Sequence, residues 1–296
     1  MNPSNPQRPE IRLENIEQAA LMIQKSRPSY GPIIDFYSQV FIAFEQSQGQ
    51  IQIEPLIIDD NLLKLKFDNG MPLIDPSQFI IDFNQAQGLM EKLIDLCENY
   101  VPKLAPSAGK LKRHLNELDL KSLAADILED GNRSLERTAV RLDLPLDVLM
   151  FFVFLSITPS LKLCSTQLST YLREAPEFRK GYCPVCGSRA NSGYLDQDGK
   201  RYLVCSLCSH EWHSNRMGCV FCDCSDNRLQ HYFFNEQEKE YRVYLCDNCK
   251  NYLKVIDLRA LDRVFIPGLE QIATLHLDMK AKQKGYTSPT PGFEEF

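Results

Sequence analysis

The chain has 296 residues and an ordinary globular composition, with 44% hydrophobic and 24% charged residues and a net charge of −6. This length can bury a sizeable core and leaves room for two or more domains. The acidic total disfavours non-specific binding to a phosphate backbone. Four thiolates around each of two divalent ions would make the protein about four units more negative still.

The cysteine content raises two alternatives for the cellular environment, a secreted disulfide scaffold or a metal-binding protein of a reducing compartment. The chain has 11 cysteines, an odd number, and its N-terminus is polar and proline-rich without an apolar h-region. These features favour the reducing compartment. The most apolar run, 148–157, is too short to cross a bilayer and is followed by Pro159. We therefore expect a cytoplasmic protein without membrane insertion.

The first part of the chain carries helical periodicity. Apolar residues recur at helical spacing over 11–27 and 32–48, and residues 49–84, with several prolines, predict an extended connection. Further helices are expected over 84–101, 107–128 and 131–142, and a longer one from Pro145 to about Arg173 with a bend at Pro159.

Near residue 181 helical spacing gives way to short alternating stretches between cysteine pairs. Residues 202–204, 230–234 and 241–245 predict strands, 262–284 a terminal helix and 288–296 a loose tail. The expected fold class is an all-helical N-terminal domain followed by two tandem rubredoxin-like or zinc-ribbon β modules and a C-terminal helix. The predicted domains are 1–178 for the helical domain, 179–217 and 218–257 for the two modules, and 258–296 for the helix and tail.

Four Cys-x-x-Cys pairs form an internal repeat in this region. Each module has a pair, a hairpin-like stretch and a second pair, with 18 residues between the pairs of the first module (187–204) and 23 in the second (223–245). Tetrahedral metal ions take four such thiolates, so pairing of nearest neighbours predicts two sites. The predicted ligands are Cys183, Cys186, Cys205 and Cys208 for the first site, and Cys219, Cys222, Cys246 and Cys249 for the second.

The spacing leaves the metal open, because all-thiolate tetrahedral sites suit both zinc and a single iron. The rival interpretation, a set of redox dithiols, normally needs a βαβ context, which the predicted elements lack. Cys224 fits a spare small residue in a turn, with ligand exchange as the alternative. Cys97 and Cys164 fit buried positions on helices.

The stretch after the second pair carries the candidate partner-binding residues. Trp212 fits either a hydrophobic plug between the ribbons or an exposed aromatic anchor for a partner. His213 and Arg216 fit either ordinary surface residues or groups that contact sulfurs or an acidic peptide. The histidines of His210-Glu211-Trp212-His213 are three apart, unlike those of a zincin helix. No other reaction motif occurs, so we predict no catalytic residue and no enzyme.

The region from Gly181 to Lys254 resembles the formate dehydrogenase accessory proteins of the FdhE type. The order and spacing of the matching pieces are much more specific than the cysteine pairs alone, and the tail is also similar through Lys284-Gly-Tyr286. The matching pieces are Tyr182 to Ser188, Arg201 to Cys208, Glu211 to His213 with Arg216, Cys219 with Cys222, Leu229 to Tyr232, and Cys246 to Lys254.

This resemblance implies a non-enzymatic, chaperone-like cytoplasmic protein that helps to mature respiratory formate dehydrogenase. The implied partner is the catalytic molybdopterin subunit of that enzyme before its export. The implied cofactors are two mononuclear tetrathiolate metal ions, with iron favoured and zinc as the alternative.

Two other functions are carried as alternatives, a rubredoxin-like electron carrier and a nucleic-acid-binding zinc ribbon protein. Residues 181–256 contain nine Lys/Arg and nine Asp/Glu, so the modules lack the basic footprint of a nucleic-acid partner. We therefore expect no nucleic acid among the partners.

Overall fold

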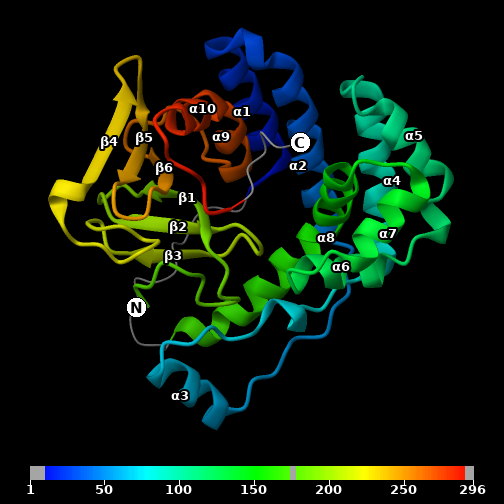
Figure 1. The fold of residues 1–296 in the computed structure, drawn as a ribbon, viewed down its shortest axis with the longest axis horizontal. Helices are drawn as coiled ribbons and strands as arrows, with labels where there is room; N and C mark the ends of the chain where they lie inside the picture. The colour runs from blue at the N-terminus through cyan, green and yellow to red at the C-terminus, as the bar shows by residue number, and fades with distance from the viewer. Residues whose placement is uncertain (1–10, 174–177, 291–296) are drawn as a thin grey trace. The chain divides into compact units, whose positions relative to one another are not determined.

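The helices and strands of the computed structural model, which describes residues 11–173 and 178–290, fall into two units (Figure 1). The helical unit contains 11–55 and 76–164. The sheet unit contains 56–75 together with 165–173 and 178–290. The polar N-terminus (1–10) and residues 291–296 of the expected tail lie outside the described residues.

The helical unit consists of helices whose buried residues follow helical spacing. In α1, for example, Ile16, Ala19, Ala20 and Ile23 form one buried stripe. The helices are α1 (Leu13–Ser26), α2 (Gly31–Gln48), α4 (Phe83–Tyr100), α5 (Ala105–Arg113), α6 (Leu120–Leu128), α7 (Arg133–Leu142) and α8 (Leu146–Leu168), whose last turn belongs to the sheet unit.

One of the expected helices, 107–128, is interrupted. A short 3-10 turn (Leu115–Glu117) separates α5 from α6, and α6 begins at its own cap, where the Asp119 carboxylate accepts a hydrogen bond from the Ser122 backbone N–H at 3.1 Å. An aspartate in this capping position favours a helix start over helix continuation. The apolar periodicity on both sides of Asp119 concealed this break.

The apolar run 148–157 lies inside the longer helix α8. Within the described chain, Leu146–Arg173 is the one helix whose length and composition would allow it to cross a membrane, with a mean hydropathy of 1.8. Pro159 lies inside α8, so the helix continues past the proline. Because 72% of the most apolar window is buried, this helix has the character of a core helix.

The segment 49–84, expected to be extended, contains α3 (Asp60–Asp68) and a 3-10 turn (Pro76–Gln78). The Asp59 carboxylate caps α3 by accepting from the backbone N–H groups of Asn61 and Leu62. Beyond α3 the chain pairs with residues far along the sequence, because the N–H groups of Leu73 and Ile74 donate to the carbonyls of Pro184 and Val185 at 2.9 Å.

These hydrogen bonds give the physical reason why 56–75 groups with the sheet unit, a division that differs from the predicted domain boundary after residue 178. Whether the four predicted segments fold independently stays a prediction.

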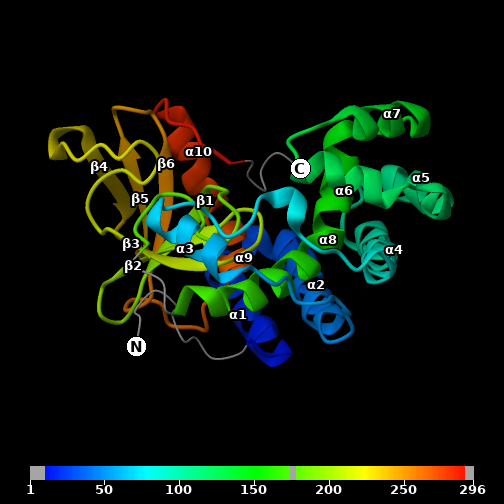
Figure 2. The same cartoon turned by 90° about the horizontal axis from the view of Figure 1, so that it is seen from below.

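Six strands form one mixed sheet in the order β3-β2-β1-β6-β5-β4 (Figures 1 and 2). Neighbouring strands are antiparallel except β1 and β6, which pair in parallel with Gly193 opposite Val255. The two cysteine modules are therefore halves of a single sheet, joined along β1 and β6. The strands are β1 (Ala190–Leu195), β2 (Arg201–Cys205), β3 (Glu211–Ser214), β4 (Gln230–Asn235), β5 (Glu238–Cys246) and β6 (Tyr252–Asp257).

The strands predicted at 202–204, 230–234 and 241–245 are confirmed as parts of β2, β4 and β5. The sequence pattern missed β1, β3 and β6. Strand β6 is buried at every position, so its side chains have no polar alternation for a period-2 search to find.

One face of the sheet packs against α9 (Pro267–Ala273) and α10 (Leu275–Gln283). The core between them includes Tyr194 and Tyr241 from the strands and Leu277 and Ala281 from α10. The expected single helix over 262–284 is thus two helices. They break at Thr274, whose hydroxyl donates to the Glu270 carbonyl at 2.7 Å.

A buried ion pair fastens α10 to β6. The Lys254 ammonium lies 2.6 Å from an Asp278 carboxylate oxygen, and both side chains are almost completely buried. The Tyr252 hydroxyl donates to the same carboxylate at 2.9 Å, and Lys254 also donates to the Gln271 carbonyl. Every charge in this contact therefore has hydrogen-bonding partners, the condition under which a buried pair is tolerated.

We expect Asp278→Ala to lower the free energy of unfolding of the sheet unit by about 3 to 5 kcal/mol, because it leaves the Lys254 charge buried without its carboxylate. Asp262→Ala is the control, since Asp262 is an exposed partner of Arg263 and its loss costs about 0 to 1 kcal/mol. Urea unfolding followed by the fluorescence of Trp212, the single tryptophan and a buried residue of the sheet unit, measures both. Equal destabilisation by the two variants would contradict the prediction.

Candidate metal centres

The four Cys-x-x-Cys pairs adopt the same tight turn. In each, the N–H of the first cysteine donates to the carbonyl five residues later, and the residue after the second cysteine has a positive φ. The four bonds run from Cys183 to Ser188 (2.8 Å), Cys205 to His210 (2.8 Å), Cys219 to Cys224 (3.0 Å) and Cys246 to Asn251 (3.1 Å). The positive φ values belong to Gly187 (76°), Ser209 (58°), Asp223 (53°) and Lys250 (58°).

Of these four positions, the sequence signals only the first, because glycine alone adopts positive φ without cost. The other three turns hold side-chain residues in the left-handed region. At one of them, Lys250, the ammonium contacts the Asp247 carboxylate at 2.5 Å. The same turn therefore forms three times without a glycine after the second cysteine. The four turns together place eight thiols in two groups.

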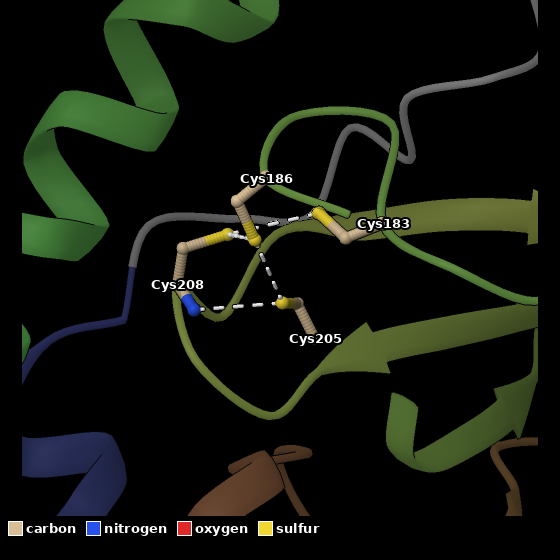
Figure 3. Close-up of side chains that lie close together, drawn as sticks. All are labelled: Cys183, Cys186, Cys205 and Cys208. Atoms are coloured by element: carbon tan, nitrogen blue, oxygen red, sulfur yellow. Dashed lines mark hydrogen bonds between the residues drawn. The ribbon is translucent and has the colours of Figure 1, made fainter. Parts of the chain in front are cut away.

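The first cysteine group contains Cys183, Cys186, Cys205 and Cys208, from the loop before β1 and the end of β2 (Figure 3). Its closest sulfur pairs lie 3.5 to 3.7 Å apart. A tetrahedral ion with metal–sulfur bonds of about 2.3 Å requires sulfurs about 3.8 Å apart. The four sulfurs therefore have nearly the spacing that one ion would impose, and all four residues are buried.

The second cysteine group contains Cys219, Cys222, Cys246 and Cys249, from the loop after β3 and the end of β5. Its sulfurs approach to 3.6 Å between Cys219 and Cys249 and 3.7 Å between Cys222 and Cys246. Three of its members are half-buried, so solvent reaches this group more easily than the first. The two groups are those that the spacing predicts, and in both the donor set and the sulfur spacing fit a tetrathiolate ion.

The thiols of the first group cannot all ionise without a cation. Burial raises the pKa of Cys183 and of Cys208, whereas hydrogen bonds from the surrounding thiols lower the pKa of Cys186. The protein alone therefore favours the thiolate of Cys186 and the protonated forms of Cys183 and Cys208. A divalent ion supplies the positive charge that four thiolates require.

The second group receives hydrogen bonds from outside its own thiols. Gln230 Nε2 lies 3.4 Å from the Cys246 sulfur, and Asn248 Nδ2 lies 3.4 Å from the Cys222 sulfur. Burial raises the pKa of Cys246, but backbone N–H donors and the Gln230 amide outweigh it and bring the pKa to about 7. These amides orient the sulfurs and stabilise negative charge on them, as outer partners of metal ligands do.

A buried arginine holds the linker that joins the two groups. Arg201, at the start of β2, is 3% exposed, and its guanidinium donates to the Ser214 hydroxyl at 3.0 Å and to the carbonyls of Asn215 and Gly218. Burial lowers its pKa to about 10, while the nearby Cys219 favours the charged form. Arg201 thus fixes the linker that enters the second group and adds positive charge beside it.

Backbone also meets backbone between the modules. A Cβ placed on Gly181, two residues before the first group, would lie 1.5 Å from the Val220 carbonyl oxygen inside the second group. Only glycine permits this approach. Sequence spacing gives no sign of this contact, because it joins turns from different modules.

The remaining candidate residues occupy different environments. Trp212 is 1% exposed and donates from Nε1 to the Lys180 carbonyl at 3.0 Å, so it packs as a plug and is not an exposed anchor in this structure. Arg216 is exposed and donates to the Gly199 carbonyl, while the His213 ring lies 5.5 Å from that of Tyr202. Their role in partner binding stays a prediction.

The three cysteines outside the two groups have structural positions. The Cys224 carbonyl closes the turn of the third pair, and its thiol belongs to neither sulfur group. Cys97 and Cys164 are fully buried in the helical unit.

His210, which follows the second cysteine pair, has no role predicted from the sequence pattern. Burial lowers its pKa to about 4, so the imidazole beside the first group is neutral.

Comparison with known proteins gives consistent matches. The model of the FdhE central domain matches residues 182–216. An FdhE homolog of Aquifex aeolicus is 25% identical over 270 residues, which cover 90% of this chain and 89% of that protein. FdhE of Escherichia coli K12 is 33% identical over 111 residues, 36% of this chain and 35% of its own length. A crystal structure of FdhE from Pseudomonas aeruginosa has the same fold, with a TM-score of 0.67, 22% identity and coverage of 98% and 97%.

We expect Gly181→Ala to weaken metal binding at the second group by about 10- to 100-fold, because the methyl group forces the Val220 turn away and disturbs the cysteines on either side of it. Competition with a chromophoric chelator measures the affinity of each group. Gly88→Ala in α4 is the control, since nothing lies within 4 Å of its added Cβ. Unchanged affinity in Gly181→Ala would disprove the close contact.

Proposed function

We propose that the chain, which is similar to FdhE proteins in sequence and in fold, is a member of that family and an accessory protein for the formation of formate dehydrogenase. The observation that carries the proposal is the pair of four-cysteine groups held in one sheet. The first group lies within residues 182–216, which the family model matches. The match to the Aquifex aeolicus homolog extends over most of both chains, which supports a role for the whole protein.

The proposed role is non-catalytic and cytoplasmic. The protein binds the catalytic subunit of respiratory formate dehydrogenase before export and supports its maturation. His213 in β3 and Arg216 in the exposed stretch after it are the proposed partner-binding residues, and Trp212 supports them from inside the module. The absence of a reaction motif in the sequence agrees with a binding role.

The eight cysteines are the proposed ligands of two mononuclear metal ions, with iron favoured by the family resemblance and zinc as the alternative. When bound, either ion closes the turns of a module, and iron can in addition accept and release one electron. The chain's own contribution is to preset the sulfur positions, through the four backbone turns and the amides of Gln230 and Asn248.

Elemental analysis of protein purified without oxygen is expected to give two ions per chain. Cys219→Ser combined with Cys222→Ser removes two ligands of the second group and should leave one ion. Cys224→Ser, outside both groups, should keep two. Iron with a reversible reduction potential would favour a redox role, whereas colourless zinc protein would exclude it. A double variant that retains two ions would refute the ligand assignment.

Binding to the partner is tested with purified catalytic subunit of formate dehydrogenase. We expect the wild-type protein and Cys224→Ser to retain the subunit in a pulldown. The variant Arg216→Glu should retain less, because it reverses a charge on the exposed stretch after β3. In a strain that lacks this gene, formate dehydrogenase activity should fall. Full activity in that strain would count heavily against the proposed function.

A further inference from the structure

Strand β4 forms one end of the six-stranded sheet. It pairs with β5 on one side, and within the described parts of the chain no strand pairs with its other side (Figures 1 and 2). The backbone N–H and C=O groups on that side form a template for a further strand. Natural proteins often block such edges with proline or with inward-pointing charges, and Gln230–Asn235, with the sequence Gln-His-Tyr-Phe-Phe-Asn, contains neither.

The face of β4 away from α10 carries an exposed aromatic pair. Tyr232 and Phe234 are 57% and 44% exposed, and their rings stack with centroids 6.2 Å apart. Tyr232 lies opposite Tyr244 of β5, with ring centroids 5.9 Å apart. An aromatic row thus runs from β5 to the free edge, where it offers apolar surface to the side chains of an incoming strand.

The opposite face of β4 is basic at the same edge. Phe233 packs against the core beneath α10, and the ammonium groups of Lys280 and Lys284 lie 5.3 and 5.9 Å from its ring centroid. The two carboxylates that contact β4 residues also have other partners: Asp247 contacts Lys250, His231 and Tyr286, and Glu238 contacts Asn235 and His276. The charge left for a ligand on this face is therefore positive.

We infer that β4 binds an extended segment of a protein partner in which apolar and acidic side chains alternate. Such a segment adds a seventh strand to the sheet through backbone hydrogen bonds. Because side chains of a strand alternate between faces, its apolar residues meet Tyr232 and Phe234 while its acidic residues meet Lys280 and Lys284. The pattern of the two faces defines the ligand class, and this inference does not depend on the proposed function.

A second copy of the chain fits this edge less well. Antiparallel pairing of two β4 strands about Phe233 would place Tyr232 against Phe234 favourably on one face. On the other face the same symmetry would bring Lys280 and Lys284 of one copy toward the same lysines of its partner. Like charges opposed in this way are destabilising. The charge distribution therefore favours an acidic partner over self-association.

The test uses the full-length protein and a soluble nine-residue peptide in which glutamate alternates with valine and phenylalanine. We expect saturable binding by fluorescence anisotropy. Lys280→Gln with Lys284→Gln should weaken it about fivefold and reduce its salt dependence. Tyr232→Thr with Phe234→Thr should also weaken it about fivefold, with residues that keep strand propensity. Lys282→Gln, which changes a lysine that does not lie over Phe233, is the control.

Two further peptides, N-methylated at odd or at even positions, distinguish strand addition from loose contact. One set of amides faces β4 and the other faces solvent, so one methylated peptide should bind like the parent and the other at least about tenfold more weakly. Equal binding of both, or equal binding of a peptide with lysine in place of glutamate, would overturn the inference. So would dimerisation of the free protein that Tyr232→Thr with Phe234→Thr abolishes, since the occupant would then be a second copy.

Discussion

The parallel pairing of β1 with β6 is the contact on which the sheet unit depends. Each cysteine module alone is a three-stranded antiparallel ribbon, and a unit of this size buries too little apolar surface to be stable without metal ions or a packing partner. The parallel ladder that pairs Gly193 with Val255 joins the two ribbons. One pair of helices, α9 and α10, therefore covers a single continuous face of the sheet. The close approach of Gly181 to Val220 and the hydrogen bonds of Arg201 strengthen the same junction. A change at either cysteine group is therefore felt by both modules.

Polar and ionic groups, as well as apolar side chains, lie in the interior of this unit. The first cysteine group is fully buried, and the buried Lys254–Asp278 pair fixes α10 to β6, so polar and ionic groups lie where most proteins place aliphatic side chains. Each buried charge is satisfied by several defined partners, a condition that specifies one register of helix against sheet. The exposed Lys280 and Lys284 of the α10 end differ from these groups, because their ammonium groups lie over the Phe233 ring of β4, at the surface of the unit.

The sequence was sufficient for the features that repeat or alternate. Helical periodicity predicted α1, α2, α4 and α7 closely, and the spacing of the pairs predicted both cysteine groups. It was insufficient where a local pattern competes with a distant contact. Strand β6 is buried throughout and has no alternation. Asp119 begins a new helix and Thr274 ends one inside continuous apolar periodicity, and the burial of Trp212 depends on residues that no spacing reveals. The pairing of Leu73 and Ile74 with the first cysteine turn depends on atoms more than 100 residues apart along the chain, which local propensity cannot indicate.

That pairing also sets a constraint on how the protein is made. Residues 56–75 belong to the sheet unit, but their partners Pro184 and Val185 are synthesised only after the whole stretch 76–164 of the helical unit. At about 5 to 20 residues per second, the segment waits roughly 6 to 22 seconds on the ribosome before its hydrogen-bonding partners exist. During this time Leu73 and Ile74, which are almost completely buried in the folded protein, lack the cysteine turn that pairs with them. The helical unit can therefore be completed first, and the sheet unit closes around an early segment of the chain only when its cysteines have emerged.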